Sequence, residues 1–284
     1  MRAIGINTWV WTSPLTDANL PDLLRHVAAL GFDAVELPLE EPGHLDPGRT
    51  AKVVRDTGLT PYVVGAMAAG RDLVATDATT VASTQDYLYA CVELAAAVGS
   101  TRVCGPFYAA TGRTWRMSDD ERDAAYGQLR THLAPVVERA AAADVVIGIE
   151  PLNRYETSLV NTVDQGLTAL GPLLGPNLGL ALDSYHLNIE ERSSADAVRR
   201  AGEHLVHLQV CGNDRGAPGH DQTDWPALLA ALDDVDYDGV LAIESFTPDN
   251  ASIAVAASVW RPLAASPDDL ARDGLRFLRG VQDG

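Results

Sequence analysis

Four residues that can bind a cation or move a proton follow short apolar runs in the second half of this 284-residue chain. They are Glu150, Asp183, Gln209 and Glu244, in the runs VVIGIE, LGLALD, LVHLQV and VLAIE. The gaps between them are 33, 26 and 35 residues, and each gap has room for a loop, a helix and a return strand. Three carboxylates and an amide at successive strand ends would converge, and like charges share a pocket only when a cation holds them. The sequence therefore predicts a divalent metal site.

The elements that must position these residues are repeated strand–helix units. Strands are predicted over 3–10, 33–39, 59–66, 101–107, 145–150, 178–183, 205–210 and 240–244. Helices are predicted over 20–31, up to 56–58, and over 84–99, 118–144 and 266–281. Eight such pairs in under 300 residues predict an α/β fold, a single (β/α)8 TIM barrel over residues 1–284, with the chemistry at the C-terminal ends of its strands. A doubly wound sheet is the alternative, but it would more often carry a GxGxxG loop after the first strand, and this chain has none there.

The composition argues against several classes of partner. A formal net charge of −18 and a pI near 4.6 argue against binding to nucleic acid or to anionic membrane surfaces. They neither favour nor exclude binding of a neutral sugar. The opening MRAIGINTWVWT does not resemble a signal peptide, and no apolar stretch has the length of a membrane span. Cys91, Cys104 and Cys211 are odd in number and widely spaced, so we expect free thiols and a cytoplasmic protein.

The four strand-end residues also have structural interpretations. Glu150 and Glu244 could pair with basic residues at the rim of the barrel, and Asp183 taken alone could be a helix N-cap. Buried glutamates are rare unless they are paired, and the four residues together favour a functional site over separate structural roles. Carboxylates with the neutral amide of Gln209 make an all-oxygen ligand set, which suits Mn²⁺ or Mg²⁺.

Two histidines lie close to these positions. His207 precedes Gln209 by two residues and faces the same side of its strand, where a hydrogen-bonded, deeper position is expected rather than a direct role. His186 follows Asp183 by three residues, either as a solvated loop residue or as a substrate contact.

Two further charged residues have open interpretations. Arg215 lies in a Gly- and Pro-containing loop, as a surface residue or as a donor to sugar oxygens or a developing oxyanion. Glu156 follows Glu150 by six residues and could pair with Arg154 or receive substrate hydroxyls.

At these residues the chain resembles the ketose 3-epimerase family (the D-tagatose and D-allulose 3-epimerase type) of the xylose isomerase-like barrels. The resembling segments are IEPLNRYETSLVNT (149–162), LDSYHLNIEE (182–191), VHLQVCGNDRGAPGHDQTDW (206–225) and VLAIESF (240–246), with GINTWVWTSP near the start and SVWRPLA (258–264) near the end. The resemblance covers nearly the whole chain.

The resemblance implies roles for individual residues. It implies a metal held by Glu150, Asp183, Gln209 and Glu244, with Glu150 and Glu244 also moving the proton at C3 of a ketose. It implies a sugar bound by Glu156, His186 and Arg215, with Phe107 and Trp115 as further substrate-binding residues that line the pocket. It further implies Mn²⁺, with Mg²⁺ or Co²⁺ as alternatives, and a homodimer or homotetramer.

One position departs from the family pattern. The family usually has an H-x-H pair where this chain reads His207-Leu208-Gln209, and glutamine there resembles hydroxypyruvate isomerase-like branches of the superfamily. The leading prediction is metal-dependent epimerisation of a free ketose at C3 through a cis-enediolate. The alternatives are an aldose–ketose isomerase, an epimerase, dehydratase or lyase of keto-inositols or keto-glycosides, and a metal-stabilised sugar-binding barrel without catalysis.

Overall fold

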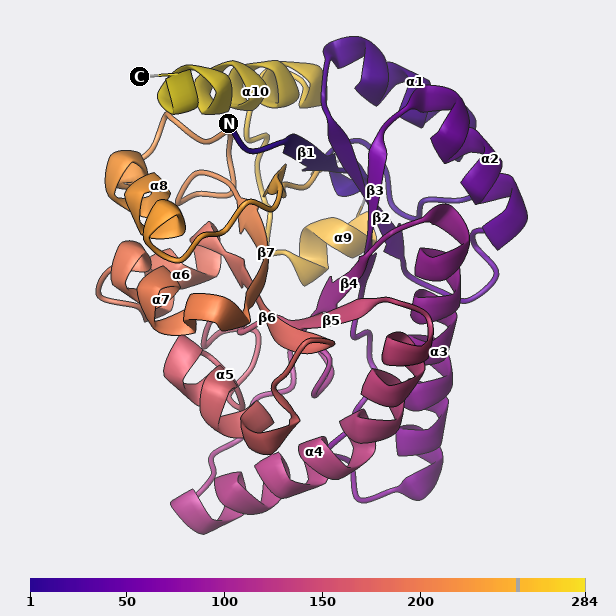
Figure 1. The fold of residues 1–284 in the computed structure, drawn as a ribbon, viewed down its shortest axis with the longest axis vertical. Helices are drawn as coiled ribbons and strands as arrows, with labels where there is room; N and C mark the ends of the chain where they lie inside the picture. The colour runs from indigo at the N-terminus through magenta and orange to yellow at the C-terminus, as the bar shows by residue number, and fades with distance from the viewer. Residues whose placement is uncertain (249–250, 284) are drawn as a thin grey trace.

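Eight parallel strands close into a barrel in chain order (Figure 1), as the sequence predicts. The protein is represented by a computed structural model that describes residues 1–248 and 251–283. The strands are β1 (Ile4–Asn7), β2 (Ala34–Leu39), β3 (Thr60–Gly65), β4 (Arg102–Gly105), β5 (Val146–Ile149), β6 (Leu178–Asp183), β7 (Leu205–Val210) and β8 (Leu241–Ile243). Pairing of β1 with β8 closes the barrel.

Most of the helices surround this barrel on the outside, whereas the helix that follows β8 lies over the centre of the barrel (Figure 1). The α-helices are α1 (Leu20–Leu30), α2 (Pro47–Thr57), α3 (Ala78–Val98), α4 (Asp119–Ala142), α5 (Val163–Leu170), α6 (Ser184–Glu190), α7 (Ser194–Ala201), α8 (Trp225–Asp234), α9 (Ala251–Ala256) and α10 (Pro267–Asp283). Short 3₁₀ helices are η1 (Thr8–Val10), η2 (Gly171–Leu173) and η3 (Gly202–His204).

The strands are buried on both faces, which explains why they read as continuous apolar runs rather than as alternating ones. Close approach of neighbouring segments also restricts residue size. A Cβ at Gly179 in β6 would lie 2.4 Å from the carbonyl oxygen of His204, so no larger side chain fits there without a shift.

Predicted helix boundaries follow local chemistry. Gly31 and Gly99 end α1 and α3 in the left-handed conformation, at φ of 96° and 79°. Ser118 caps α4 in a reciprocal capping box with Glu121. The third helix begins at Ala78, earlier than predicted, because Asp77 accepts hydrogen bonds from the first backbone N–H groups.

The first strand is shorter than the predicted 3–10. It ends at Asn7, whose side-chain oxygen accepts a hydrogen bond from the backbone N–H of Trp9 at 2.9 Å and starts η1. The chain therefore turns across the barrel end, and Trp9 leaves the strand pattern.

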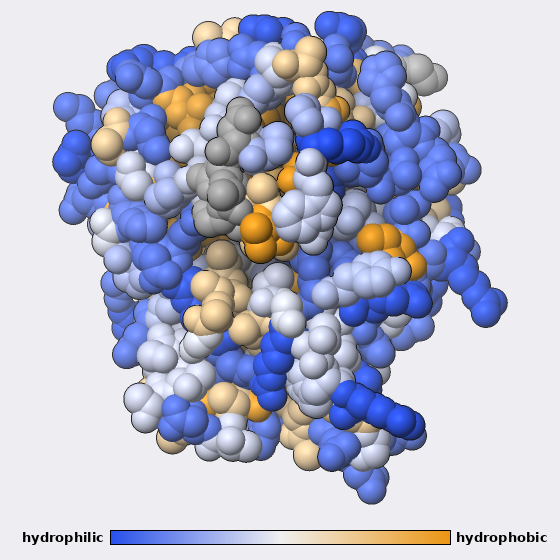
Figure 2. Space-filling view, turned by 180° about the vertical axis from the view of Figure 1, so that it is seen from behind, coloured by the Kyte–Doolittle hydropathy of each residue, from blue (hydrophilic) through white to orange (hydrophobic). Residues whose placement is uncertain are grey.

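The two ends of the chain meet at the barrel bottom, where the backbone N–H of Arg2 donates to Oε1 of Gln282 at 2.7 Å. Among the described helices, none combines the length and apolar character needed to cross a membrane. The face of the molecule that is turned away from the viewer in Figure 1 is mainly hydrophilic, with apolar side chains near its centre (Figure 2).

Candidate active site

The strand-end residues of β5 to β8 come together at one end of the barrel. Glu150 follows β5, Asp183 ends β6, Gln209 lies in β7 and Glu244 follows β8, and each side chain belongs to a residue that is at most 6% exposed. A cavity of about 250 Å³ opens above them, and Glu150, Gln209 and Glu244 contribute to its wall. The predicted convergence is therefore present, and the residues are held by strands rather than by mobile loops.

Arg215 carries the positive charge of this cluster. Its Nη1 donates to Oδ2 of Asp183 and, at 2.9 Å, to Oε2 of Glu244. The residue has a φ of 68°, a left-handed conformation that turns the loop after β7 back over the barrel. Its guanidinium lies 4.1 Å from the ring centroid of Tyr185 and is buried, so it is not the surface arginine of the alternative interpretation.

Asp183 is both the N-cap of α6 and a member of the charged cluster. Its Oδ1 accepts a hydrogen bond from the backbone N–H of Tyr185 at 2.9 Å and caps α6. Its Oδ2 faces Arg215 in the cluster. One carboxylate thus starts a helix and remains available to the site.

Burial controls the protonation of the two glutamates. Burial, followed by repulsion from Glu244 and Asp183, raises the pKa of Glu150 well above its ordinary value. Burial raises the pKa of Glu244 well above its ordinary value although Arg215 opposes the shift. Burial thus favours the protonated form of both carboxyl groups.

His186 and Glu156 share one organising residue, Asn153, which the sequence did not single out. The backbone N–H and the Nδ2 of Asn153 both lie 3.0 Å from Nδ1 of His186, and the same Nδ2 donates to Oε1 of Glu156 at 2.7 Å. Burial and then Arg215 lower the pKa of His186 to about 3, so its ring is neutral. Arg154 does not pair with Glu156, because its guanidinium binds Glu190 at 3.0 Å.

Glu36 is the second residue of the site to which no sequence pattern pointed. This fully buried carboxylate of β2 accepts from Nδ2 of Asn7 at 2.7 Å and from Nε2 of Gln209 at 3.0 Å, and its Oε1 lies 2.6 Å from Nε2 of His207. Gln209 also donates to Oε1 of Glu244 at 2.9 Å. His207 thus has the deeper, hydrogen-bonded position predicted for it, and both amide hydrogens of Gln209 are directed to carboxylates.

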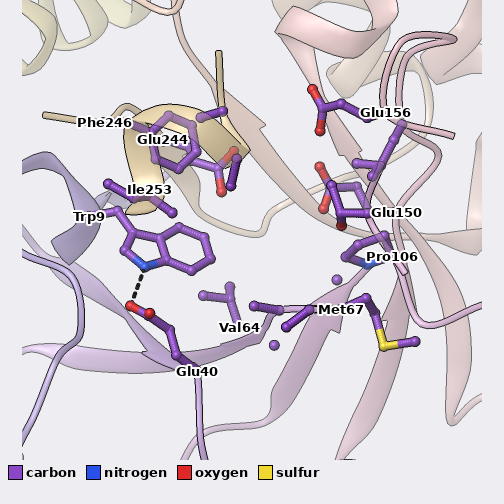
Figure 3. A pocket seen from close by; sticks show the side chains of 18 of the residues that line it. Trp9, Glu40, Val64, Met67, Pro106, Glu150, Glu156, Glu244, Phe246 and Ile253 are labelled. Carbon is purple, nitrogen blue, oxygen red and sulfur yellow. Dashed lines mark hydrogen bonds between the residues drawn. The ribbon is translucent and has the colours of Figure 1, made fainter. Parts of the chain in front are cut away.

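The remaining cavity wall is mostly apolar and comes from the first half of the barrel, from the region of α9 and from the segments that follow β5 and β8. Figure 3 shows the carboxyl groups of Glu150 and Glu244 on opposite sides of the cavity, with the indole of Trp9 between Glu244 and Glu40. Nε1 of Trp9 donates to Oε1 of Glu40 at 3.0 Å. Apolar wall residues include Val64, Met67, Pro106, Leu152, Phe246 and Ile253.

The prediction that Phe107 and Trp115 line the pocket is wrong for the cavity as described, because other residues of their segment line it instead. Pro106 and Thr111 line the cavity, whereas Phe107 and Trp115 are not among the described residues that do. Phe107 is fully buried, and its ring lies against the backbone of Gly105 on the far side of the wall. Trp115 is half-buried beneath the guanidinium of Arg113, 4.1 Å from its ring centroid.

The donor set fits a divalent cation. A carboxylate oxygen of Glu150 and one of Asp183 lie within 4.8 Å of each other, and Glu244 and Gln209 adjoin this pair. Arg215 bridges Asp183 and Glu244 where three carboxylates gather, which leaves negative charge in excess. Oxygen donors with excess negative charge favour hard divalent ions.

Comparison with known proteins shows the family of this chain. The xylose isomerase-like TIM barrel family model matches residues 24–281. The chain is 31% identical over 275 residues to a probable ketose 3-epimerase of Synechocystis sp., covering 97% of this chain and 95% of that one. It is 30% identical over 277 residues to an L-ribulose 3-epimerase of Methylomonas sp., covering 97% and 96%. Among solved structures, an L-ribulose 3-epimerase superposes with a TM-score of 0.92 at 28% identity, covering 100% of this chain and 95% of the other.

Proposed function

The chain belongs to the ketose 3-epimerase family of xylose isomerase-like TIM barrels and is an isomerase-class enzyme, and from that premise we propose that it epimerises a free ketose at C3. The observation that carries the proposal is the pair of buried glutamates, Glu150 and Glu244, which come from β5 and β8 and flank the cavity (Figure 3). A D-allulose 3-epimerase of Methylomonas sp. whose structure contains D-allulose superposes with a TM-score of 0.88 at 29% identity, covering 99% of this chain and 98% of that one.

The proton at C3 of a ketose is acidic because it lies next to the C2 carbonyl. One glutamate removes this proton from one face, and the other returns a proton to the opposite face, which inverts C3. Which residue acts first depends on the direction of reaction. The glutamate that acts as the base must be ionised, and the glutamate that acts as the acid must carry a proton. Burial raises the pKa of both carboxyl groups, which favours the protonated form that the acid needs.

Removal of the proton leaves an enediolate whose charge needs stabilisation. Arg215 and His186, whose Nη2 and Nε2 atoms lie 3.1 Å apart, are placed to donate hydrogen bonds to the developing oxyanion. Glu156, held by Asn153, accepts from a substrate hydroxyl. Burial of these groups excludes water and strengthens the electrostatic interactions.

Glu150, Asp183, Gln209 and Glu244 would hold the divalent metal, which we propose to be Mn²⁺ with Mg²⁺ or Co²⁺ as alternatives. When bound, the ion supplies Lewis-acid stabilisation of negative charge. The fit of the site to a cation rests on its buried carboxylates, which exceed the charge of Arg215.

We also propose a homodimer or homotetramer in the cytoplasm. Exposed aromatic residues support association, since Tyr155 is 77% and Trp260 is 72% exposed. Cys91, Cys104 and Cys211 are buried and free, which supports a reducing compartment. Light scattering coupled to size exclusion measures the oligomeric state directly.

Proton NMR in D₂O tests the reaction. The chelator-treated protein is reloaded with Mn²⁺, which is removed before the spectra are recorded, or with Mg²⁺. It is then incubated with fructose, allulose, tagatose or sorbose. Deuterium at C3 together with a new ketose supports the proposal and ranks the substrates. Exchange at C1 with formation of an aldose identifies an isomerase instead, and no exchange with any sugar rejects free ketoses as substrates.

A further inference from the structure

The hydrogen bonds around His186 determine which of its ring nitrogens carries a proton. Nδ1 lies 3.0 Å from the backbone N–H of Asn153 and 3.0 Å from its side-chain Nδ2. A backbone N–H can only donate, so Nδ1 must present its lone pair to it.

The side-chain amide of Asn153 has only one orientation that satisfies its neighbours. Its Oδ1 accepts from the backbone N–H of Tyr155 at 2.9 Å, while its Nδ2 donates to the carboxylate of Glu156 at 2.7 Å. Exchanging the oxygen and nitrogen would place two donors together at one contact and two acceptors at the other. The amide therefore places a second donor beside Nδ1 of His186. Asn153 is 1% exposed, so water does not compete for these hydrogen bonds.

We propose that Asn153 is a positioning residue that holds His186 in the tautomer protonated at Nε2 and directs Glu156 into the same cavity. In this tautomer Nε2 of His186 donates a hydrogen bond to a substrate oxygen and cannot ligate a metal, because it has no free lone pair. The part of the inference that concerns substrate rests on the proposed function, whereas the tautomer itself does not. His186 is accordingly excluded from the metal ligands, although its ring lies close to Glu150 and Asp183.

The assigned tautomer leaves donors in the cavity without an acceptor. Nε2 of His186 and Nη2 of Arg215 lie 3.1 Å apart, and two N–H groups cannot bond to each other. Nε of Arg215 is buried and has no hydrogen-bond partner among the described residues. Oε1 of Glu150 is 3.4 Å from Nε2, beyond the usual hydrogen-bond distance. The unused donors fit a ligand oxygen that carries full or partial negative charge, such as the C2 oxygen of a ketose.

Nitrogen NMR of ¹⁵N-histidine-labelled protein tests the tautomer without any assay of activity. The chain has 7 histidines, and the His186→Gln variant identifies the signals of His186 by their loss. The expected spectrum of the metal-free and the Mg²⁺-loaded protein has an unprotonated Nδ1 and a protonated Nε2. A protonated Nδ1 in either state overturns the assignment.

Asn153→Asp tests the positioning role. The backbone N–H of residue 153 still donates to Nδ1, whereas the new carboxylate favours a proton there and repels Glu156. We therefore expect a mixture of the two tautomers in place of the single form protonated at Nε2, and a loss in kcat on the order of 100-fold. Mn²⁺ affinity, measured by electron paramagnetic resonance, should change less than threefold, since none of the proposed metal ligands contacts Asn153. A tenfold or greater loss of Mn²⁺ affinity in this variant contradicts the exclusion of His186 from the ligands.

Asn161→Asp is the matched control, with the same change in the same loop between β5 and α5. Nδ2 of Asn161 donates to the carbonyl oxygens of Leu152 and Thr157 and does not bond to His186. The control should keep the protonated Nε2 and most of kcat. Equal losses of kcat in both variants with an unchanged tautomer would assign Asn153 a purely structural role.

The two proposals fail separately. A protonated Nε2 in a protein that exchanges no ketose proton retains the tautomer and rejects the proposed reaction. A protonated Nδ1 in a protein that epimerises ketoses retains the proposed reaction and rejects the proposed tautomer. If Asn153→Asp does not fold, the spectrum of the unmodified protein still decides the tautomer.

Discussion

The two halves of the barrel have the same backbone geometry and different tasks. The ends of β5 to β8 carry Glu150, Asp183, Gln209 and Glu244, whereas β3 and β4 reach the same cavity with small or apolar residues such as Val64. In a closed parallel barrel all strand ends are positioned alike, so the residue types alone decide which half performs chemistry and which half shapes the cavity.

One residue crosses this division. Glu36 belongs to β2, yet its carboxylate accepts hydrogen bonds from Gln209 of β7 inside the barrel. The first half therefore contributes to the chemistry by orienting a side chain of the second half.

The largest effect is expected when the acid–base pair is broken. Glu150→Gln and Glu244→Gln should each reduce C3 exchange by on the order of 1,000-fold, because an amide cannot remove or return the proton. Exchange is measured by NMR in D₂O under saturating sugar and metal, while sugar binding is measured by calorimetry and should persist. Full turnover by Glu244→Gln would exclude it from the proton transfer.

Glu36→Gln tests the contribution that crosses the barrel. Loss of the carboxylate removes an acceptor for Gln209 and His207, and we expect Mn²⁺ affinity to fall by about 10–100-fold. Glu40→Gln is the matched control, since Glu40 lines the cavity but accepts from Trp9 and Ser13. Similar affinities in the two variants would show that the network around Glu36 has no part in holding the metal.

The sequence predicts that the second half of the barrel carries the charged site residues. It does not predict the hydrogen bond between Gln209 and Glu36 that links the two halves. Regular spacing is enough to place Glu150 and Glu244 at the same end of the barrel, after β5 and β8. Glu36 lies in an apolar strand, and its partner in β7 is set by closure of the barrel, a long-range property that no local pattern contains. Its only signal is a charge within a buried strand, which is rare without a partner.

Loops limit prediction in a different way. Phe107 and Pro106 are adjacent, and only the folded path of the loop decides that Pro106 faces the cavity while Phe107 packs behind it. Asn153 likewise has no periodic pattern to indicate its direction. Side chains on regular strands alternate predictably, whereas loop residues take directions set by contacts distant in sequence.

Metal-free protein should become less stable as pH rises. The pKa of Glu150 and of Glu244 lies well above the ordinary 4.5 in the folded state, so the stability they contribute is present below that value and lost as pH rises through the folded pKa. We expect Tm of chelated protein to fall by on the order of a few degrees from mildly acidic to neutral pH. Metal needs the ionised carboxylates, so its stabilisation should grow over the same range.

Glu150→Gln is the internal control for this pH dependence. It removes one of the two coupled carboxyl groups and should flatten the dependence of Tm on pH in metal-free protein. A Tm that instead rises with pH in chelated, unmodified protein would contradict the raised pKa of the pair.

The smallest effect is expected from the half that shapes the cavity. Met67 is 1% exposed and lines the apolar wall, so Met67→Leu changes the shape of that wall with little change in volume. The ratio of kcat/KM for two ketoses that differ at C4 should shift by about tenfold at most, with little change in kcat for the better substrate. Met117→Leu, at a half-buried methionine that is not among the described cavity residues, should leave the ratio unchanged. A large loss of kcat in Met67→Leu without a change in the ratio would mean that this wall positions the reacting carbon, and the two halves would then share the chemistry.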